Sequence, residues 1–322
     1  MTSYARVLFI PVLLLTFVSF AAEPDLSAGI ALFEQEKYAE AKAFFEKHND
    51  GKNAQALYYL GRIAVEQDDY ETAEAHLEKA CALSPDIHEY VSWLGKAYGS
   101  HGREADLITK GLLAPKIHKA FARAVELKPD DVESRQDLVS FYIEAPSFLG
   151  GSFEKAREQA AAIEKLDGAE GARAYARISR AENKPEDAYA ALKKGSAAAP
   201  DNVPLAIDAA LAAQEVKRWN DSFAILEDVV SRKPDAWLAM FYIGRGAALS
   251  GENLERGAQA IEKFLAESPK DDQFPRDAAH NRLGQIYEKQ KDNAKAREQY
   301  QAALKLNPGN KDAAAGLARV GG

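Results

Sequence analysis

Three arginines, Arg173, Arg177 and Arg180, are spaced so that they could bind an anion together. Steps of four and three residues place their side chains along one face of a helix. A row of guanidinium groups presents paired N–H donors that match the oxygens of a carboxylate or a phosphate. Glutamates from the same part of the chain could pair with this row instead: Glu144, Glu170 and Glu215. The two interpretations, an anion site and internal ion pairing, are equally favoured.

Residues typical of catalysis or metal binding are sparse. Six histidines occur, but no two have a metal-ligand spacing such as H-E-x-x-H. His101 and His118 flank a long insertion and could approach each other, yet no further ligands stand at a recognisable spacing. There is no glycine-rich phosphate loop, nucleophile elbow or Ser/His/Asp order. We therefore expect no catalytic residues, no bound metal and no cofactor.

A repeat of 34 residues organises the chain and must position the arginine row. The segment Ala54–Asp86 aligns without a gap on Asp277–Gly309. Both copies carry Leu-Gly, then an alanine, then a proline at the same steps. This spacing resembles the tetratricopeptide repeat family, in which each repeat is a pair of antiparallel helices. The segments FARAVELKPDD and EAPSFLGGS also resemble a group of exported bacterial repeat proteins without an assigned activity.

The resemblance extends from Glu23 to Val320 and implies an all-α fold, a right-handed superhelical solenoid. In this family the first helix of each repeat lines a concave groove, and most members are scaffolds or adaptors. We expect eight hairpins, at 22–53, 54–87, 88–131, 132–168, 169–202, 203–236, 237–270 and 277–310, and a short capping helix at 311–320. The predicted domains are thus a signal peptide at 1–21 and a single solenoid at 22–322.

Small residues are expected where the two helices of each hairpin cross, because a bulky side chain there would overpack the contact. The predicted pairs are Gly29/Ala41, Gly61/Ala73, Gly95/Ile117, Val139/Ala156, Ala176/Ala188, Ala210/Ser222, Gly244/Gly257 and Gly284/Ala296. Ile117 and Val139 depart from the rule, and both lie in repeats that carry insertions.

Those insertions, 102–115 and 145–152, are expected at the turn between the two helices of the third and fourth repeats. Equivalent turns of adjacent repeats lie side by side, which predicts one apolar lip. Its residues are Leu107, Leu112, Leu113, Phe148 and Leu149. The alternative is a plug of the same residues that fills the space left by imperfect packing at Ile117 and Val139.

The resemblance also implies which residues face the groove. They are Tyr58, Arg62, Lys96, Arg173, Arg177, Arg180, Phe241 and Arg245, with Asn281, Gln285 and Lys289 in the eighth repeat. Our hypothesis is that the arginine row binds an acidic or carboxylate-terminated segment of a protein or peptide. The lysine–asparagine carboxylate clamp of chaperone-binding members is missing, so their specificity is not expected here.

The ends and the composition predict the compartment and exclude some partners. Residues 1–21 resemble a cleaved secretory signal, with Arg6, an apolar run and a small-residue site ending at Ala21; an uncleaved anchor is the alternative. A net charge of −8 argues against nucleic-acid binding. Cys81 is the only cysteine, so no internal disulfide forms. We expect a periplasmic protein without stable membrane insertion.

These observations together favour a non-catalytic protein- or peptide-binding scaffold of the bacterial cell envelope. The first alternative is a structural protein of the envelope that forms homo-oligomers. The second alternative is an enzyme or accessory factor that acts on cell-wall material.

Overall fold

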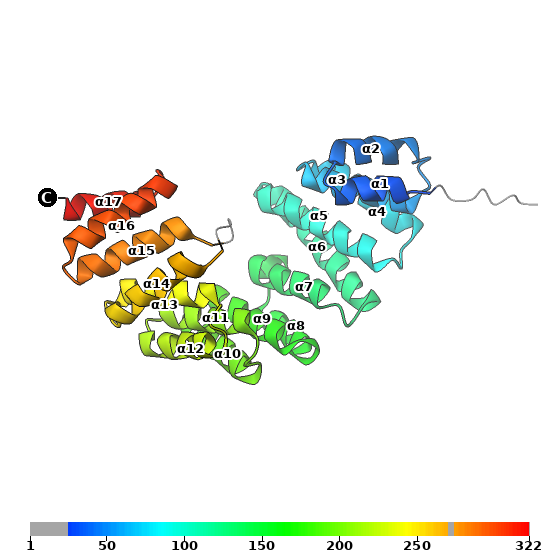
Figure 1. Ribbon diagram of the computed structural model, residues 1–322. Coiled ribbons are helices and arrows are strands. Elements are labelled where there is room, and N and C mark those ends of the chain that lie inside the picture. The colour runs from blue at the N-terminus through cyan, green and yellow to red at the C-terminus, as the bar shows by residue number, and fades with distance from the viewer. Residues whose placement is uncertain (1–24, 270–273, 322) are drawn as a thin grey trace, which may run out of the picture. The chain divides into compact units, whose positions relative to one another are not determined.

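The computed structural model describes residues 25–269 and 274–321, and all regular structure in these ranges is helical (Figure 1). The helices form consecutive pairs: α1 (Ser27–Glu34) with α2 (Tyr38–Lys47), α3 (Ala54–Glu66) with α4 (Tyr70–Leu83), α5 (His88–Glu104) with α6 (Leu107–Leu127), α7 (Val132–Glu144) with α8 (Phe153–Leu166), α9 (Gly168–Ala181) with α10 (Pro185–Ala198), α11 (Val203–Glu215) with α12 (Trp219–Arg232), α13 (Trp237–Ser250) with α14 (Leu254–Glu267), and α15 (Arg276–Lys289) with α16 (Asn293–Leu306). Helix α17 (Lys311–Val320) follows the last pair. We call the first helix of each pair its A helix and the second its B helix. The predicted all-α fold of helical hairpins is confirmed.

The chain divides into two compact units, and the boundary lies between Ala97 and Tyr98 inside α5. Each unit has its own buried apolar clusters, which are built from side chains of its A and B helices. Helical hairpins are present in both units. That the two units form the single solenoid expected over 22–322 stays a prediction.

Glycines in the A helices make room for large side chains of the paired B helices. A β-carbon on Gly61 would lie 2.5 Å from Cγ of Leu77, and one on Gly284 would lie 2.7 Å from a ring carbon of Tyr300. Both distances are too short for real contacts, so an alanine at either position would force the facing side chain to shift. The sequence paired each glycine with the alanine one turn earlier in the B helix. The structure shows that a large residue further along the B helix fills the space.

Most turns between paired A and B helices contain a non-glycine residue in the left-handed backbone conformation. In six hairpins one non-glycine residue of the turn has a φ of +52° to +65°. These residues are Glu36, Asp68, Asn183, Lys217, Asn253 and Lys291. The hairpins α5–α6 and α7–α8, which contain the insertions and are described throughout, have no such residue, although Gly150 has φ +104°.

The first insertion is helical, which corrects the expectation that 102–115 lengthens a turn. Helix α5 continues to Glu104, and α6 begins at Leu107 after Asp106 caps it by accepting two backbone hydrogen bonds. Pro115, the last residue of the predicted insertion, lies inside α6. The second insertion does form a compact loop, with a 3₁₀ turn at Ser147–Leu149.

Candidate partner-binding face

The A helices of the second unit lie side by side and form one face, which we call the A face (Figure 1). Helix α7 contacts α9, α11 contacts α13, and α13 contacts α15. Side chains of α9 and α11 are joined by two ion pairs. The predicted arginine row lies on α9, so its neighbours on α7 and α11 determine what the row can bind.

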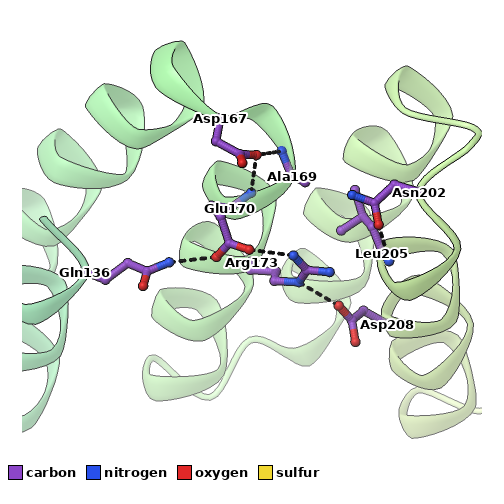
Figure 2. Close-up of polar contacts among 8 residues, drawn as sticks. All are labelled: Gln136, Asp167, Ala169, Glu170, Arg173, Asn202, Leu205 and Asp208. Atoms are coloured by element: carbon purple, nitrogen blue, oxygen red, sulfur yellow. Dashed lines mark hydrogen bonds and ion pairs between the residues drawn. The ribbon is translucent and has the colours of Figure 1, made fainter. Parts of the chain in front are cut away.

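Arg173 is held by carboxylates on two helices (Figure 2). Its Nη1 donates to Oε1 of Glu170 at 2.6 Å, and its Nε donates to Oδ2 of Asp208 at 2.8 Å. Gln136 of α7 donates to the second oxygen of Glu170 at 2.6 Å. Asp167 caps α9 by accepting hydrogen bonds from two backbone N–H groups, which fixes the start of the helix. Three A helices are thus linked by one polar network.

The network also stabilises the charged form of Arg173. Partial burial opposes the charged form, but hydrogen bonds to Asp208 and Glu170 outweigh it and raise the pKa of Arg173. Glu170 was predicted from the sequence as an internal partner, whereas Asp208 was not. Asp208 was missed because its approach depends on the register between two hairpins.

The other two arginines of the row differ in their partners. Nε of Arg180 donates to Glu215 at 3.1 Å. Glu215 is one of the glutamates predicted from the sequence as internal partners of the row. Arg177 is exposed and donates to the hydroxyl of Ser140 at 2.7 Å. Within the described residues, Arg177 forms no ion pair. Two members of the row are therefore neutralised internally, and only Arg177 presents an uncompensated charge.

The predicted groove residues Phe241 and Arg245 lie on α13 but in different environments. Phe241 is 6% exposed and packs near Phe264, so it belongs to the core rather than to the A face. Arg245 is half-buried and donates to the side-chain carbonyl of Gln214. Buried Gln214 in turn donates to Ser222 at 3.0 Å, which keeps this amide oriented.

In the first unit, Arg62 is enclosed by aromatic rings. Its guanidinium carbon lies 4.4 Å from the ring centroid of Phe33 and 4.3 Å from that of Trp93, and Nη1 donates to Tyr58 at 3.3 Å. Lys96 extends over Trp93 at 5.2 Å. Burial raises the pKa of Tyr58, while Arg62 acts in the opposite direction. The three residues predicted here form one cation–aromatic cluster whose main contacts are internal.

The predicted lip residues divide into exposed and packed members. Leu107, Leu112 and Phe148 are 70%, 69% and 77% exposed. Leu113 is buried, and Leu149, like Ile117, packs against the core that contains Phe121. The loop needs glycine, because a β-carbon at position 151 would lie 1.8 Å from the carbonyl oxygen of Ala145. The segment thus has features of both predicted alternatives, with a packed inner side and an apolar outer side.

The described residues contain no group of three or more His, Cys, Asp or Glu side chains that could hold a metal. Nε2 of His118 lies 2.9 Å from the hydroxyl of Tyr142, and burial together with Lys155 lowers the pKa of this histidine. In the same part of the chain, none of the helices has the length and apolar character needed to cross a bilayer. The predicted signal peptide at 1–21 lies outside the described residues.

Comparison with known proteins connects the geometry to a family. Family models described as Tetratricopeptide repeat match residues 26–86 and 277–310. The C-terminal part of a TPR repeat-containing protein from Cytophaga hutchinsonii is 15% identical, with 91% of this chain and 99% of that chain covered, at a TM-score of 0.51.

Two further solved structures are similar at lower scores. A tetratricopeptide repeat protein from Parabacteroides merdae is 15% identical, covers 84% of this chain and 99% of its own, and has a TM-score of 0.48. A thermophilic TPR protein from Thermus thermophilus is 21% identical, covers 59% and 97%, and has a TM-score of 0.45. None of the curated protein sequences gives a significant match.

Proposed function

We propose that this chain, which is a tetratricopeptide repeat protein, is a non-catalytic scaffold that binds a protein or peptide through its A face. Proteins of this family generally serve in protein interactions. The second unit offers a face of ordered helices whose polar side chains are held by hydrogen bonds. Such a face is organised before a partner arrives, so binding does not require the scaffold to become ordered.

A preference for acidic partners is supported by the exposure of Arg177 and by its lack of an ion pair among the described residues. This side chain is exposed and has a neutral partner, Ser140, between two arginines that are fixed by carboxylates. A carboxylate from a partner can pair with Arg177 without displacing an internal ion pair. We therefore propose Arg177 as the contact for an acidic or carboxylate-terminated segment, and assign Arg173 and Arg180 to positioning.

The proposed location is the periplasm, reached through the signal at 1–21. The apolar run and the small residues before Glu23 support this proposal. N-terminal sequencing of protein recovered from the cell envelope tests it, with Ala22 expected as the first residue. An N-terminus at Met1 in a soluble cytosolic fraction would exclude export.

Crosslinking and pull-down from envelope extract test the binding proposal. The bait is the mature chain, and the comparison is Arg177→Glu against Lys119→Glu, an exposed position on a B helix. We expect Arg177→Glu to lose partners that Lys119→Glu retains. Equal recovery with both variants would refute the role of Arg177.

A second candidate function is self-association, favoured by the exposed apolar side chains of Leu107, Leu112 and Phe148. Light scattering on the purified protein, with Leu107→Ser/Leu112→Ser as the comparison, tests this candidate. A monomer at all concentrations would remove it.

A further inference from the structure

Three cations on two neighbouring A helices lack the carboxylate partners that Arg173 and Arg180 have. Arg245 donates to the amide oxygen of Gln214, and Arg282 donates to that of Gln285 at 2.8 Å. Lys289 is exposed. Within the described residues, none of these three cations has a carboxylate oxygen within 4.0 Å. In a chain with 49 acidic and 41 basic residues, this local excess of positive charge requires an explanation.

Two of these cations, Arg282 and Lys289, border a cavity formed by α13, α15 and α17. Its volume is about 470 Å³, and its lining residues are Ala248, Leu249, Arg282, Gln285, Glu288, Lys289 and Arg319. Helices α15 and α17 contribute charged groups, and α13 contributes an apolar wall. The cavity lies wholly within the second unit.

The carboxylate of Glu288, which lines the cavity, is already engaged. It accepts two hydrogen bonds from Arg319, at 2.7 and 2.9 Å, and a third from the hydroxyl of Tyr300 at 2.6 Å. These contacts neutralise Arg319 and leave Glu288 little capacity to pair with other cations. Arg282 and Lys289 therefore supply two uncompensated positive charges to the cavity.

The surroundings of Arg282 destabilise its charged form when no anion is bound. Burial, and secondarily repulsion from Arg245, lower the pKa of Arg282, while Asp312 acts weakly in the opposite direction. An anion bound to Arg282 in the cavity would offset this repulsion. Paired N–H donors also match the oxygens of a phosphate group in geometry.

We propose that the cavity between α13, α15 and α17 binds the phosphate group of a small ligand through Arg282 and Lys289, with Arg245 adding charge. A dianionic phosphate matches the positive charge at this place better than a single carboxylate does. Ala248 and Leu249 provide an apolar contact for the organic part of such a ligand. This site does not depend on partner binding at Arg177, which lies on α9.

Titration of the purified protein with inorganic phosphate, followed by calorimetry or by NMR shifts of α15 amides, tests the proposal. We expect saturable binding that weakens with added salt, because the attraction is electrostatic. Both Arg282→Gln and Lys289→Gln should weaken it about tenfold or more, since each removes a charge-assisted hydrogen bond. Lys305→Gln is the matched control, because it removes an exposed lysine from α16 of the same hairpin.

Two results would overturn the site. The first is acetate binding as strongly as phosphate, which would indicate unselective attraction of anions. The second is phosphate affinity that Lys289→Gln and Lys305→Gln leave equally unchanged. If Arg282→Gln fails to fold by circular dichroism, Lys289→Gln still decides, because Lys289 is exposed and its loss does not disturb the core. If Arg282→Gln and Lys289→Gln still pull down the partners of the wild-type protein, the phosphate site is separate from the proposed scaffold function.

Discussion

The guanidinium of Arg173 in α9 and the carboxylate of Asp208 in α11 are joined by a 2.8 Å hydrogen bond between two neighbouring hairpins. Because Glu170 and Gln136 extend the same network to α7, the first arginine of the row connects three hairpins. The main effect of Arg173 is therefore on stability and register. Arg177, which forms no ion pair with a carboxylate of the described residues, is the proposed contact for an acidic partner.

Removing both partners of this pair should reveal a modest coupling energy. We expect Arg173→Gln and Asp208→Asn to be non-additive by about 0.5–1 kcal/mol, since both side chains remain partly exposed to solvent. Urea unfolding of the wild type, the two single variants and the double variant measures this value. Additive effects would show that the pair contributes nothing to the linkage of α9 and α11.

Replacing Gly284 by alanine should destabilise the last hairpin. The new methyl group would lie 2.7 Å from the ring of fully buried Tyr300, which is overpacking with a cost of about 1–3 kcal/mol. Gly99→Ala in α5 is the control, because nothing lies within 4 Å of its added β-carbon. It should be neutral or stabilising by up to about 1 kcal/mol, since alanine favours a helix interior. Equal melting temperatures for the two variants would contradict this account of the glycine.

Cys81 should react slowly with thiol reagents in the folded protein. Burial, with a smaller effect of Glu78, raises the pKa of Cys81 to about 11. Only a small fraction is then thiolate at pH 8, whereas the unfolded chain has a cysteine of ordinary acidity. Iodoacetamide labelling followed by mass spectrometry should proceed much faster in urea than in buffer. Labelling at the same rate under both conditions would show that the thiol is not protected.

Glu288 should make the C-terminal hairpin sensitive to acid. Hydrogen bonds from Arg319, despite opposition by burial, lower the pKa of Glu288 below its ordinary value of 4.5. The unfolded state therefore takes up a proton before the folded state does, and stability falls as pH decreases below about 4.5. Glu288→Gln should reduce this slope in urea unfolding between about pH 5 and pH 3. Glu298→Gln, at an exposed position on α16, is the control and should retain the wild-type slope.

The loop at 147–149 should respond differently to changes at its two apolar residues. Phe148 is exposed, so Phe148→Ser should leave the melting temperature nearly unchanged. Leu149 packs on a core with Ile117, so Leu149→Ser should lower the free energy of unfolding by about 1–3 kcal/mol. Thermal unfolding compares the two. Loss of self-association in Phe148→Ser without loss of stability would support the lip, and an unfolded Phe148→Ser would support the plug.

The helical hairpins were predictable because their determinants are local. Leu-Gly, alanine and proline at fixed steps specify a close crossing and a helix end within one repeat. The length of α6 was not predictable in this way. Pro115 is typical of a helix start, yet α6 begins at Leu107 and continues through the proline.

The candidate site was predictable only in part, because its contacts depend on the register between hairpins. The arginine row was found by its spacing, but Asp208 reaches Arg173 from the next hairpin. Arg282 was missed because the family pattern does not place its step in the groove. Phe241 was assigned to the groove by its step, although its ring is buried in the core. Position in a repeat thus identifies a helix face less reliably than it identifies a helix.

The left-handed backbone of the six A–B turns has a consequence for how this protein can vary. Glu36, Asp68, Asn183, Lys217, Asn253 and Lys291 differ in charge and size but share one conformation. The turn therefore selects against β-branched residues at this place and tolerates almost any polar identity. The direction of the chain at these turns therefore depends on one backbone conformation. The side chain at this position can be substituted by another polar residue without changing how the two helices are connected.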